Sequence, residues 1–496
     1  MRELISETIK DAITGKLVMG KGDRMVSRVV TDSREAGPED VFFALVGEKN
    51  DGHDYLVQVF EKGCKVVVAS DVDKVLTSTK GTPEADLPDV ILVPDTKKAL
   101  QKLSAWYLDS LDLKAKVGVT GSVGKTSTRD FLYYVLSEGF RTSRSIKNYN
   151  NSFGLPLSLL SFSDDSEAAV IEMGMDGKGS IDLLADLVRP ETAVITNVGV
   201  SHMENFPGEG RMGILNTKLE ITNYFDEDST LIINASNDML SDLDMAARGI
   251  PGRLIKVGTD EGCDYISENV VDNGTEGIEF DLRAEGKSYH VTLPVPGAHN
   301  SINAALAIAC GVRYGLSIEE AIRGLERVEL TEKRLTLREK DGITVIDDTY
   351  NAAPDSVKSA INTLMATKVP EGGRRILITG DMGELGTEAE AGHRSIGEYS
   401  FEKGVDVHIA IGELSVNTLE GWRNAALAAG HELEEHEGEP HILIDVNTGR
   451  GAEHFNKKET VMDGIREHIH EGDCILVKAS RYMQLEKIVK AITEDQ

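Results

Sequence analysis

The sequence has little cysteine, and its cysteines show no pairing. Four of them, Cys64, Cys263, Cys310 and Cys474, are scattered along 496 residues. None has the close spacing to another that marks a zinc site, and so few thiols argue against a disulfide framework. This absence argues against a disulfide-stapled secreted scaffold and a zinc-binding domain. It favours a reducing compartment, and we expect a cytoplasmic protein.

Long hydrophobic runs are also missing. The longest apolar stretches, such as Lys65–Ser70 and Asp89–Asp95, have the length of a β-strand. A membrane-spanning helix needs about 20 consecutive apolar residues. The first 18 residues are amphipathic and carry acidic side chains, which is not the pattern of a secretory signal. We therefore expect no membrane insertion.

Positive charge is in short supply. The chain has 83 Asp and Glu against 53 Lys and Arg, a formal net charge of −30 that is spread along the sequence. Such a balance favours solubility and disfavours binding to nucleic acid. The hydrophobic content of 40% is ordinary for a globular protein. We expect a monomeric, multidomain enzyme that acts on small molecules.

The pattern of apolar runs predicts an α/β protein of three domains. Short β-like runs fill residues 1–97, a small α/β domain, and longer buried-type strands fill residues 98–332, a central P-loop ATPase-like α/β domain. Within the latter, the polar section Thr259–His290 is predicted to form a β-excursion. In residues 333–496 apolar runs alternate with helix-length segments, which predicts a Rossmann-like parallel sheet covered on both faces. No G-x-G-x-x-G follows its first strand, so a dinucleotide is not indicated.

A Gly-rich turn is the strongest chemical signal. The segment "GVTGSVGKTST" (Gly118–Thr128) follows an apolar run and precedes a helical pattern. It misses the common P-loop spacing by one residue, because Val119 stands where the first glycine is expected. Backbone N–H groups at a helix start can bind phosphate, a lysine can meet the outer phosphates, and a threonine hydroxyl can ligate Mg²⁺. The nucleotide-binding residues predicted here are Gly121, Ser122, Val123, Gly124, Lys125, Thr126 and Ser127.

Two further polar residues follow buried-type runs. Glu172 ends "AAVIE" and His202 follows "TAVITNVGVSH". Ligands bind at the carboxyl ends of strands in open α/β sheets, so with a P-loop the two form a candidate Mg²⁺ pair. Separately, each has a structural alternative, a strand-end acid and a loop histidine bonded to backbone. Lys218 in "NTKLEI" is expected, on its own, to be a solvated helix lysine.

A polar cluster, "VIDDTYNAAPDS" (Val345–Ser356), lies where the first strand of the C-terminal sheet should end. That position suits contact with a ligand. Asp355 has a capping role as its alternative explanation.

These segments resemble the Mur ligases, ATP-dependent amide-forming enzymes of peptidoglycan precursor synthesis. The Gly-rich turn is similar to their shortened P-loop. "TDSR" (Thr31–Arg34) and "DGHDY" (Asp51–Tyr55) resemble segments that hold the uridine-diphosphate end of the sugar-peptide substrate. "PGAHNSINAALAIA" is similar to the segment around adenine. The resemblance implies nucleotide contacts by His299, Asn300, Asn303, Arg334 and Asp348, and substrate contacts by Ser33, Arg34, Asp51, Gly52, His53, Asn150, Asn151, Tyr350 and Asn351.

Within the family, "NYNNSFGLPLSLL", "DDTYNAAPDSVKSAI" and "GDMGELG" are similar to the members that add D-alanyl-D-alanine to UDP-N-acetylmuramoyl-tripeptide. The Asn-Pro-Arg signature expected of the members that add a diamino acid is absent. Two alternatives remain, another amide ligase of the superfamily (amino-acid-adding or folylpolyglutamate synthase-like) and a P-loop switch protein. Whether the tripeptide ends in lysine or diaminopimelate stays open.

The resemblance also implies a mechanism. Lys125, His202 and Lys218 are implied to be catalytic, with ATP and Mg²⁺ as cofactors. Lys218 aligns with a lysine that many members carry as a carbamate, so the implied metal ligands are Thr126, Glu172, His202 and carbamylated Lys218.

Overall fold

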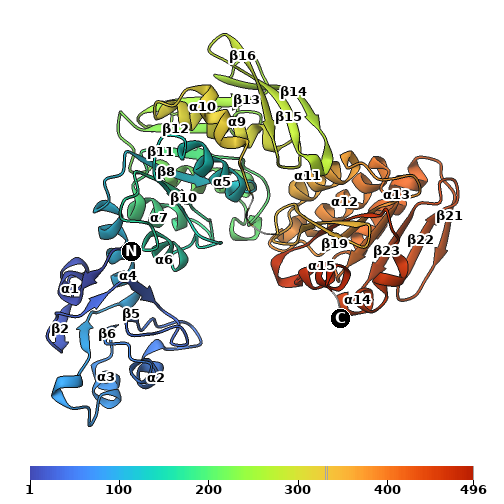
Figure 1. Cartoon of the computed structure of the whole chain (residues 1–496). Helices are drawn as coiled ribbons and strands as arrows, with labels where there is room; N and C mark the ends of the chain where they lie inside the picture. Colours follow the sequence, from blue (N-terminus) through green and yellow to red (C-terminus); the bar gives the residue numbers. More distant parts are fainter. Residues whose placement is uncertain (330, 332, 495–496) are drawn as a thin grey trace. The chain divides into compact units, whose positions relative to one another are not determined.

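The computed structural model describes residues 1–329, 331 and 333–494. The described chain forms sheets of two, five, nine and eight strands, with helices packed on them (Figure 1). The α/β class expected from the sequence is confirmed. The predicted domain boundary at 97/98 falls in the first turn of α4 (Thr96–Asp109), and residue 332 lies outside the described residues. The positions of the two domain boundaries therefore stay predictions.

The five-stranded sheet lies near the amino terminus. Its strand order is β2-β7-β6-β5-β4, in which β4 to β7 are parallel and β2 is antiparallel to β7. Valine-rich strands buried on both faces form its centre, as parallel sheets require. Its strands are β2 (Lys16–Met19), β4 (Arg28–Val30), β5 (Asp40–Phe43), β6 (Val66–Ala69) and β7 (Asp89–Leu92). The surrounding elements are β1 (Leu4–Ile5), β3 (Met25–Val26), α1 (Ser6–Ile13), η1 (Gly52–Tyr55), α2 (Leu56–Glu61), α3 (Val72–Ser78) and η2 (Glu84–Asp86).

The nine-stranded sheet carries the Gly-rich turn. Its order is β16-β15-β14-β13-β12-β11-β8-β10-β9, and the β-excursion predicted from the polar section is its antiparallel end. Its strands are β8 (Ala115–Thr120), β9 (Thr142–Arg144), β10 (Ala168–Glu172), β11 (Thr192–Ile195), β12 (Thr230–Asn234), β13 (Arg253–Gly258), β14 (Tyr265–Asp272), β15 (Ile278–Ala284) and β16 (Lys287–Leu293). Its helices are α4, α5 (Lys125–Leu136), α6 (Gly154–Leu159), α7 (Ser180–Val188), α8 (Gly210–Leu219), α9 (Asn300–Arg313) and α10 (Ile318–Leu325), with η3 (Met203–Asn205), η4 (Glu220–Thr222) and η5 (Gly274–Glu276).

The eight-stranded sheet has the order β17-β18-β24-β19-β20-β23-β22-β21. Alternate residues of one strand enter different cores: Val345 packs with α14 and α15, whereas Ile346 packs with α11 and α12. The sheet is thus covered on both faces, as predicted. Its strands are β17 (Thr336–Lys340), β18 (Ile343–Asp348), β19 (Arg375–Gly380), β20 (Val407–Ile411), β21 (Leu433–His436), β22 (His441–Asp445), β23 (Gly451–Phe455) and β24 (Cys474–Lys478). Its helices are α11 (Pro354–Ala366), α12 (Ala389–Lys403), α13 (Val416–Ala428), α14 (Lys458–His468) and α15 (Glu486–Thr493), with η6 (Gly386–Glu388) and η7 (Arg481–Met483).

One part of the parallel prediction is wrong. Strand β22 is antiparallel to both of its neighbours, β21 and β23, and β17 is antiparallel to β18. The reason is local, since residues 437–440 join β21 to β22 as a short turn, too short for the helical crossover that parallel strands need.

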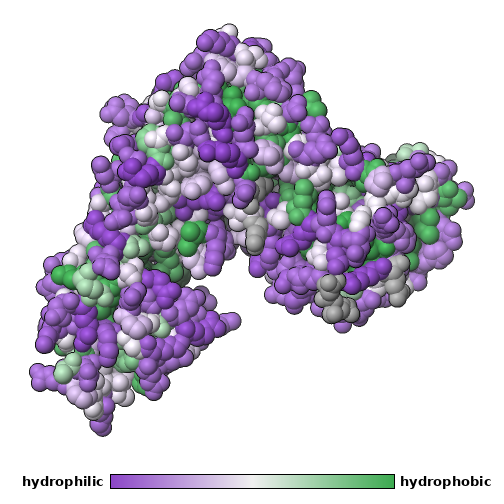
Figure 2. Space-filling model, viewed as in Figure 1, coloured by the Kyte–Doolittle hydropathy of each residue, from purple (hydrophilic) through white to green (hydrophobic). Residues whose placement is uncertain are grey.

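The chain divides into two compact units. The first contains residues 1–119, 139–193 and 220–229, and the second contains the remaining described residues. Polar side chains cover most of the visible surface, with apolar residues scattered between them (Figure 2). Among the described residues, no helix is long and apolar enough to cross a membrane.

Candidate nucleotide and substrate site

The Gly-rich turn joins the end of β8 to the start of α5, as predicted. Gly124 precedes the helix with φ +81°, a conformation that favours glycine. At Gly121 a Cβ would lie 1.9 Å from the Thr196 Oγ1, so only glycine fits there. These two glycines let the backbone pass close to β11 and enter the helix without a clash.

Two amides of this turn are committed within the protein. Ser122 donates its N–H to the Asn197 carbonyl at 3.0 Å, and Val123 donates to the Asn197 side-chain oxygen at 2.8 Å. The amides of Ser122 and Val123 are thus bonded to Asn197 in this structure, and the assignment of the two residues to the nucleotide site stays a prediction. Asn197 follows β11 and fixes the shape of the turn. Sequence reasoning missed it because no local pattern marks it.

Lys125 and Thr126 open the helix. The Lys125 ammonium donates to the carbonyls of Gly121 at 2.7 Å and Ser122 at 3.1 Å, so the side chain folds over the turn. Thr126 is buried beside it, and Ser127 follows on the same helix. A positive charge, helix N–H groups and a hydroxyl therefore converge on one small region, the donor set expected of a phosphate site.

The start of α9 lies against this turn. A Cβ on Gly124 would contact the amide group of Asn303 at 3.2 Å. Asn303 donates to the Asn300 side-chain oxygen at 3.0 Å, and Asn300 donates to the Pro296 carbonyl at 2.7 Å. His299 precedes them at the exposed N-cap of α9. Of the residues expected around adenine, Asn303 thus lies next to the Gly-rich turn, and Asn300 is bonded to Asn303.

Lys218 is buried, which contradicts the expectation of a solvated helix lysine. It lies near the end of α8 with 1% of its surface exposed, and no hydrogen-bond or ion-pair partner is recorded for it among the described residues. Burial, with a smaller contribution from the Lys125 charge, lowers the pKa of Lys218 well below its ordinary value. Burial therefore favours the neutral amine, because an unpaired buried ammonium is very costly.

His202 bonds to a partner that the sequence did not predict. Its Nδ1 lies 2.9 Å from the carboxylate of Glu384, in the loop between β19 and η6. Both residues have left-handed backbones, with φ of +63° and +64°. The bond to His202 lowers the pKa of Glu384, although partial burial opposes the shift. Glu384 belongs to the "GDMGELG" segment, which was singled out but given no role.

Asp348 ends β18 and is held by a second unpredicted partner, Lys478 at the end of β24. The Lys478 ammonium donates to the Asp348 carboxylate at 2.5 Å and to the Asn351 carbonyl at 3.0 Å. Burial raises the pKa of Asp348 above its ordinary value, although the Lys478 charge opposes that shift. Arg334 stacks on the Tyr350 ring, 4.2 Å from its centroid, and its Nε has no hydrogen-bond partner among the described residues.

In the first unit, Glu172 is the last residue of β10, in register with Val119 of β8. The Asn150 side chain donates to its carboxylate at 2.8 Å. Asn151 instead lies just before α6, and its side-chain oxygen accepts the amides of Phe153 and Gly154. Of these two neighbouring asparagines, Asn150 bonds through its side chain to a candidate site residue, and the side chain of Asn151 bonds to local backbone.

The remaining predicted substrate residues lie at the carboxyl edge of the five-stranded sheet. Ser33 and Arg34 follow β4, and Asp51, Gly52 and His53 lie in the connection after β5. Ser33 is bonded to Gln58, whereas the Arg34 side chain is 81% exposed and pairs with its neighbour Asp32 at 2.6 Å. The bonds from Arg34 lower the pKa of Asp32 to about 2.

A metal site made by protein ligands alone is not present in the described part of the chain. No group of three or more His, Cys, Asp and Glu side chains there could hold a metal ion. A bound ion would need further oxygen ligands, such as phosphate, water or a modified lysine.

Three family models match most of the chain. They are the Mur ligase family catalytic domain over residues 25–107, the Mur ligase middle domain over residues 119–311 and the Mur ligase glutamate ligase domain over residues 333–481.

Similar proteins are known over the full length. The UDP-N-acetylmuramoyl-tripeptide--D-alanyl-D-alanine ligase of Bacillus subtilis is 35% identical over 497 residues, covering 99% of each chain. The enzyme of the same name from Escherichia coli is 30% identical, again over 99% of each chain. A crystal structure of MurF from Acinetobacter baumannii superposes with a TM-score of 0.82 at 27% identity, covering 100% of both chains. MurF ligase from Thermotoga maritima in complex with ADP has the same fold, with a TM-score of 0.74 at 24% identity and coverage of 95% and 97%.

Proposed function

The chain belongs to the Mur ligase family, and from that premise we propose that it joins D-alanyl-D-alanine to UDP-N-acetylmuramoyl-tripeptide at the expense of ATP. The observation that carries this proposal is the full-length similarity to enzymes of that name, at 35% identity over 99% of both chains. The reaction is an amide-bond-forming step of peptidoglycan precursor synthesis. We place the protein in the cytoplasm as a monomer, in keeping with its acidic composition and unpaired cysteines.

The reaction has two steps. A substrate carboxylate attacks the γ-phosphorus of ATP, so that a carboxylate–phosphorus bond forms and ADP leaves. The amine of D-alanyl-D-alanine then attacks the acyl phosphate carbon, loses a proton and expels inorganic phosphate through a tetrahedral intermediate. Because phosphoryl transfer offers the protein little covalent chemistry, positioning and electrostatics supply the catalysis.

Lys125 has the central role in the first step. Its ammonium already lies over the turn, bonded to the carbonyls of Gly121 and Ser122. Phosphate oxygens are stronger acceptors than neutral carbonyls, so we propose that the ammonium exchanges these bonds for the outer phosphates of ATP. Asn197 holds the turn in shape during that exchange.

ATP use follows from the family, and Mg²⁺ is our proposal. The absence of a protein-only ligand cage among the described residues fits an ion that arrives with the ATP phosphates, since Mg²⁺ keeps several waters and takes few carboxylates. Thr126, Glu172, His202 and modified Lys218 would hold it. When bound, such an ion neutralises charge that develops on phosphoryl oxygens.

We propose that Lys218 is carbamylated. A neutral amine adds to CO₂ and releases a proton to give an anionic carbamate. The burial of Lys218, with no partner among the described residues, favours the neutral amine. Incubation of the protein with ¹³C-labelled bicarbonate should give a carbamate carbon signal in the NMR spectrum, and that signal should be lost in Lys218→Ala. A Lys218→Ala protein that keeps the signal, or full activity of the wild type without bicarbonate or CO₂, would exclude the carbamate.

The nucleotide is proposed to contact His299, Asn300, Asn303, Arg334 and Asp348, and the sugar-peptide to contact Ser33, Arg34, Asn150, Tyr350 and Asn351 together with the Asp51–His53 turn. The exposed guanidinium of Arg34 and the unpartnered Nε of Arg334 support these roles. Asn151 is kept as a candidate only through its backbone, since its side chain bonds to local backbone.

Phosphate release from ATP tests the proposal. Release should require both UDP-N-acetylmuramoyl-tripeptide and D-alanyl-D-alanine. Release with a single amino acid in place of the dipeptide would indicate an amino-acid-adding ligase, and release with a folate substrate would indicate a folylpolyglutamate synthase-like enzyme. Hydrolysis that needs neither substrate would instead indicate a nucleotide-driven switch protein. Paired assays with the lysine and the diaminopimelate tripeptide would fix the third residue.

A further inference from the structure

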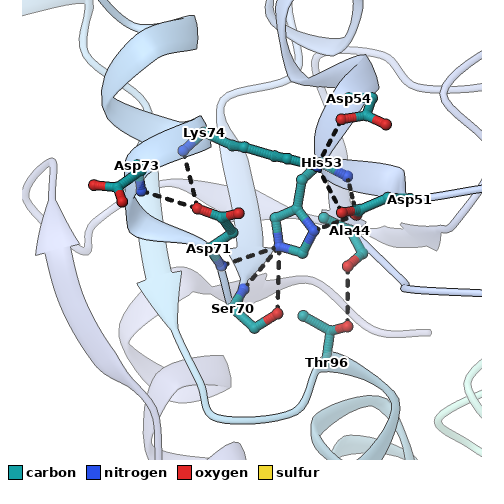
Figure 3. A network of polar contacts seen from close by, with 9 residues as sticks. All are labelled: Ala44, Asp51, His53, Asp54, Ser70, Asp71, Asp73, Lys74 and Thr96. Carbon is teal, nitrogen blue, oxygen red and sulfur yellow. Dashed lines mark hydrogen bonds and ion pairs between the residues drawn. The ribbon is translucent and has the colours of Figure 1, made fainter.

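The His53 side chain is bonded on both sides within the first unit (Figure 3). Its Nδ1 lies 2.6 Å from the Asp51 carboxylate. Its Nε2 accepts the backbone amide of Ser70 at 2.9 Å and that of Asp71 at 3.3 Å. Only 1% of the side chain is exposed. The ring therefore connects the Asp51–Tyr55 turn to the loop between β6 and α3.

The contacts assign one tautomer to this ring. Backbone amides can only donate, so Nε2 must be the unprotonated acceptor, and the proton sits on Nδ1 and is donated to Asp51. Burial raises the pKa of Asp51, but the bonds from Lys74 and His53 outweigh it and lower the pKa to about 2. Asp51 is consequently an anion that fixes a neutral His53 in the Nδ1–H form.

A second side chain makes the reverse connection. Lys74, in the first turn of α3, donates to the Asp51 carboxylate at 2.7 Å and to Asp54 at 2.6 Å. The helix that carries it is capped by Asp71, which accepts the amide of Lys74 at 3.0 Å. The turn thus contacts the loop through His53, and the helix after the loop contacts the turn through Lys74, as the dashed lines of Figure 3 show.

The Asp51–Tyr55 turn and the Ser70–Asp71 loop lie at the edge of the sheet at which open α/β sheets bind ligands. Strands β5 and β6 are parallel, so the turn after β5 and the loop after β6 both lie at their carboxyl ends. Gly52 packs tightly there, because a Cβ would lie 2.8 Å from the Leu45 amide nitrogen. Arg34, with its exposed guanidinium, follows the neighbouring strand β4 to the same edge.

We propose that the His53 side chain positions the turn and does not itself touch the substrate, which contacts the turn through its other groups. Both of its ring nitrogens are bonded within the protein, and its exposed fraction of 1% leaves no ring atom for a ligand. Its Nδ1–H tautomer sets the spacing between the Asp51–Tyr55 turn and the Ser70–Asp71 loop. That spacing shapes the surface that receives the uridine-diphosphate end of the substrate. The proposal rests on the proposed function and assigns a role within it.

Steady-state kinetics separate positioning from general stability. In the full-length protein, His53→Ala should raise KM for UDP-N-acetylmuramoyl-tripeptide about tenfold, the loss expected for one bond to a charged group. Both kcat and the KM for ATP should stay within about twofold, because the P-loop is untouched. A fall in kcat at unchanged KM would show a loss of folded enzyme instead and would overturn the proposal.

Conservative variants identify the contact that matters. His53→Asn offers a donor to Asp51, and His53→Gln offers an acceptor near the Ser70 amide. At least one should recover part of the KM increase of His53→Ala. If neither variant recovers any of the KM increase while both remain folded by circular dichroism, the positioning role is excluded.

Two measurements distinguish positioning from direct contact. With ¹⁵N-labelled histidine, the His53 signals should report an Nδ1–H ring and stay in place when the tripeptide substrate is added. A substrate-induced change at Nε2 would show that His53 is a ligand. Lys74→Met should raise the same KM, and His53→Ala with Lys74→Met should cost less than the two single effects combined, because both act on one turn. Full additivity would overturn the proposal.

The proposed function can fail separately. If the wild-type chain releases no phosphate with the two substrates, the ligase assignment fails. The positioning role is then tested by calorimetric titration with UDP, whose affinity should fall about tenfold in His53→Ala. Unchanged UDP affinity in that variant would overturn it.

Discussion

Replacing Lys478 with methionine should destabilise the protein strongly, because it leaves the buried carboxylate of Asp348 without its partner. Lys478 and Asp348 are 4% and 12% exposed at the side chain and lie 2.5 Å apart. Removing one partner of a buried pair costs roughly 3–5 kcal/mol, most of it the penalty of the charge left behind. Methionine has nearly the same length as lysine, so packing is largely kept.

The matched control is the double variant Lys478→Met with Asp348→Asn. It removes both charges together, and an exchange of a buried pair for neutral groups is often close to neutral. We therefore expect the double variant to recover more than half of the stability that Lys478→Met loses. Urea denaturation followed by circular dichroism, at several pH values, measures the free energy of unfolding of four proteins. They are the wild type, Lys478→Met, Asp348→Asn and the double variant.

The pH dependence has a definite sign. The pKa of Asp348 is raised in the folded protein, so folding favours its protonated form. The stability that this preference contributes is complete below the unfolded pKa, about 3.9, and is lost as pH rises through the folded pKa. Without Lys478 the folded pKa rises further. The deficit of Lys478→Met should therefore shrink as pH falls from 8 towards 5. A deficit below about 1 kcal/mol at pH 7, or one that grows on acidification, would refute the reasoning.

Three other outcomes are expected. Lys125→Ala should lower kcat by roughly 100- to 1000-fold, the loss seen for one preorganised phosphate or oxyanion donor, with an unchanged circular dichroism spectrum; near-normal kcat in the phosphate-release assay would contradict its role. Gly124→Ala should cost about 1 kcal/mol or more of stability because φ is +81°, and a thermal melt without any decrease would contradict this. Glu384→Gln should reduce kcat/KM about fivefold with an unchanged melting temperature, since a half-exposed bond to His202 contributes about 1 kcal/mol at most; equal kcat/KM in the two proteins would show that the pair has no catalytic effect.

The secondary structure and the position of the Gly-rich turn could be predicted because their signals are local. Apolar runs of strand length mark the buried strands, and glycines followed by Lys125-Thr126 mark the start of α5. The direction of β22 could not be predicted in this way. Its sequence is the same kind of apolar run, and only the short connection from β21 makes it antiparallel.

Residues that act through distant partners were out of reach. Asn197, Glu384 and Lys478 each meet the site from another strand end, so their spacing to the motif carries no signal. The burial of Lys218 could not be predicted either. Its neighbours in sequence are those of an ordinary helix, and its burial is decided by how α8 packs, which the period of the pattern does not encode.

The two hydrogen bonds between Asn197 and the Gly-rich turn have a thermodynamic consequence. A turn held in one shape by both the carbonyl and the side chain of Asn197 has little conformational freedom left to lose. Binding of a nucleotide then requires little ordering of the loop, so less of the contact energy offsets an entropy cost and more of it appears as affinity. The turn uses two of its amides to bond Asn197, and the rigidity that these bonds give compensates for the amides that a ligand loses.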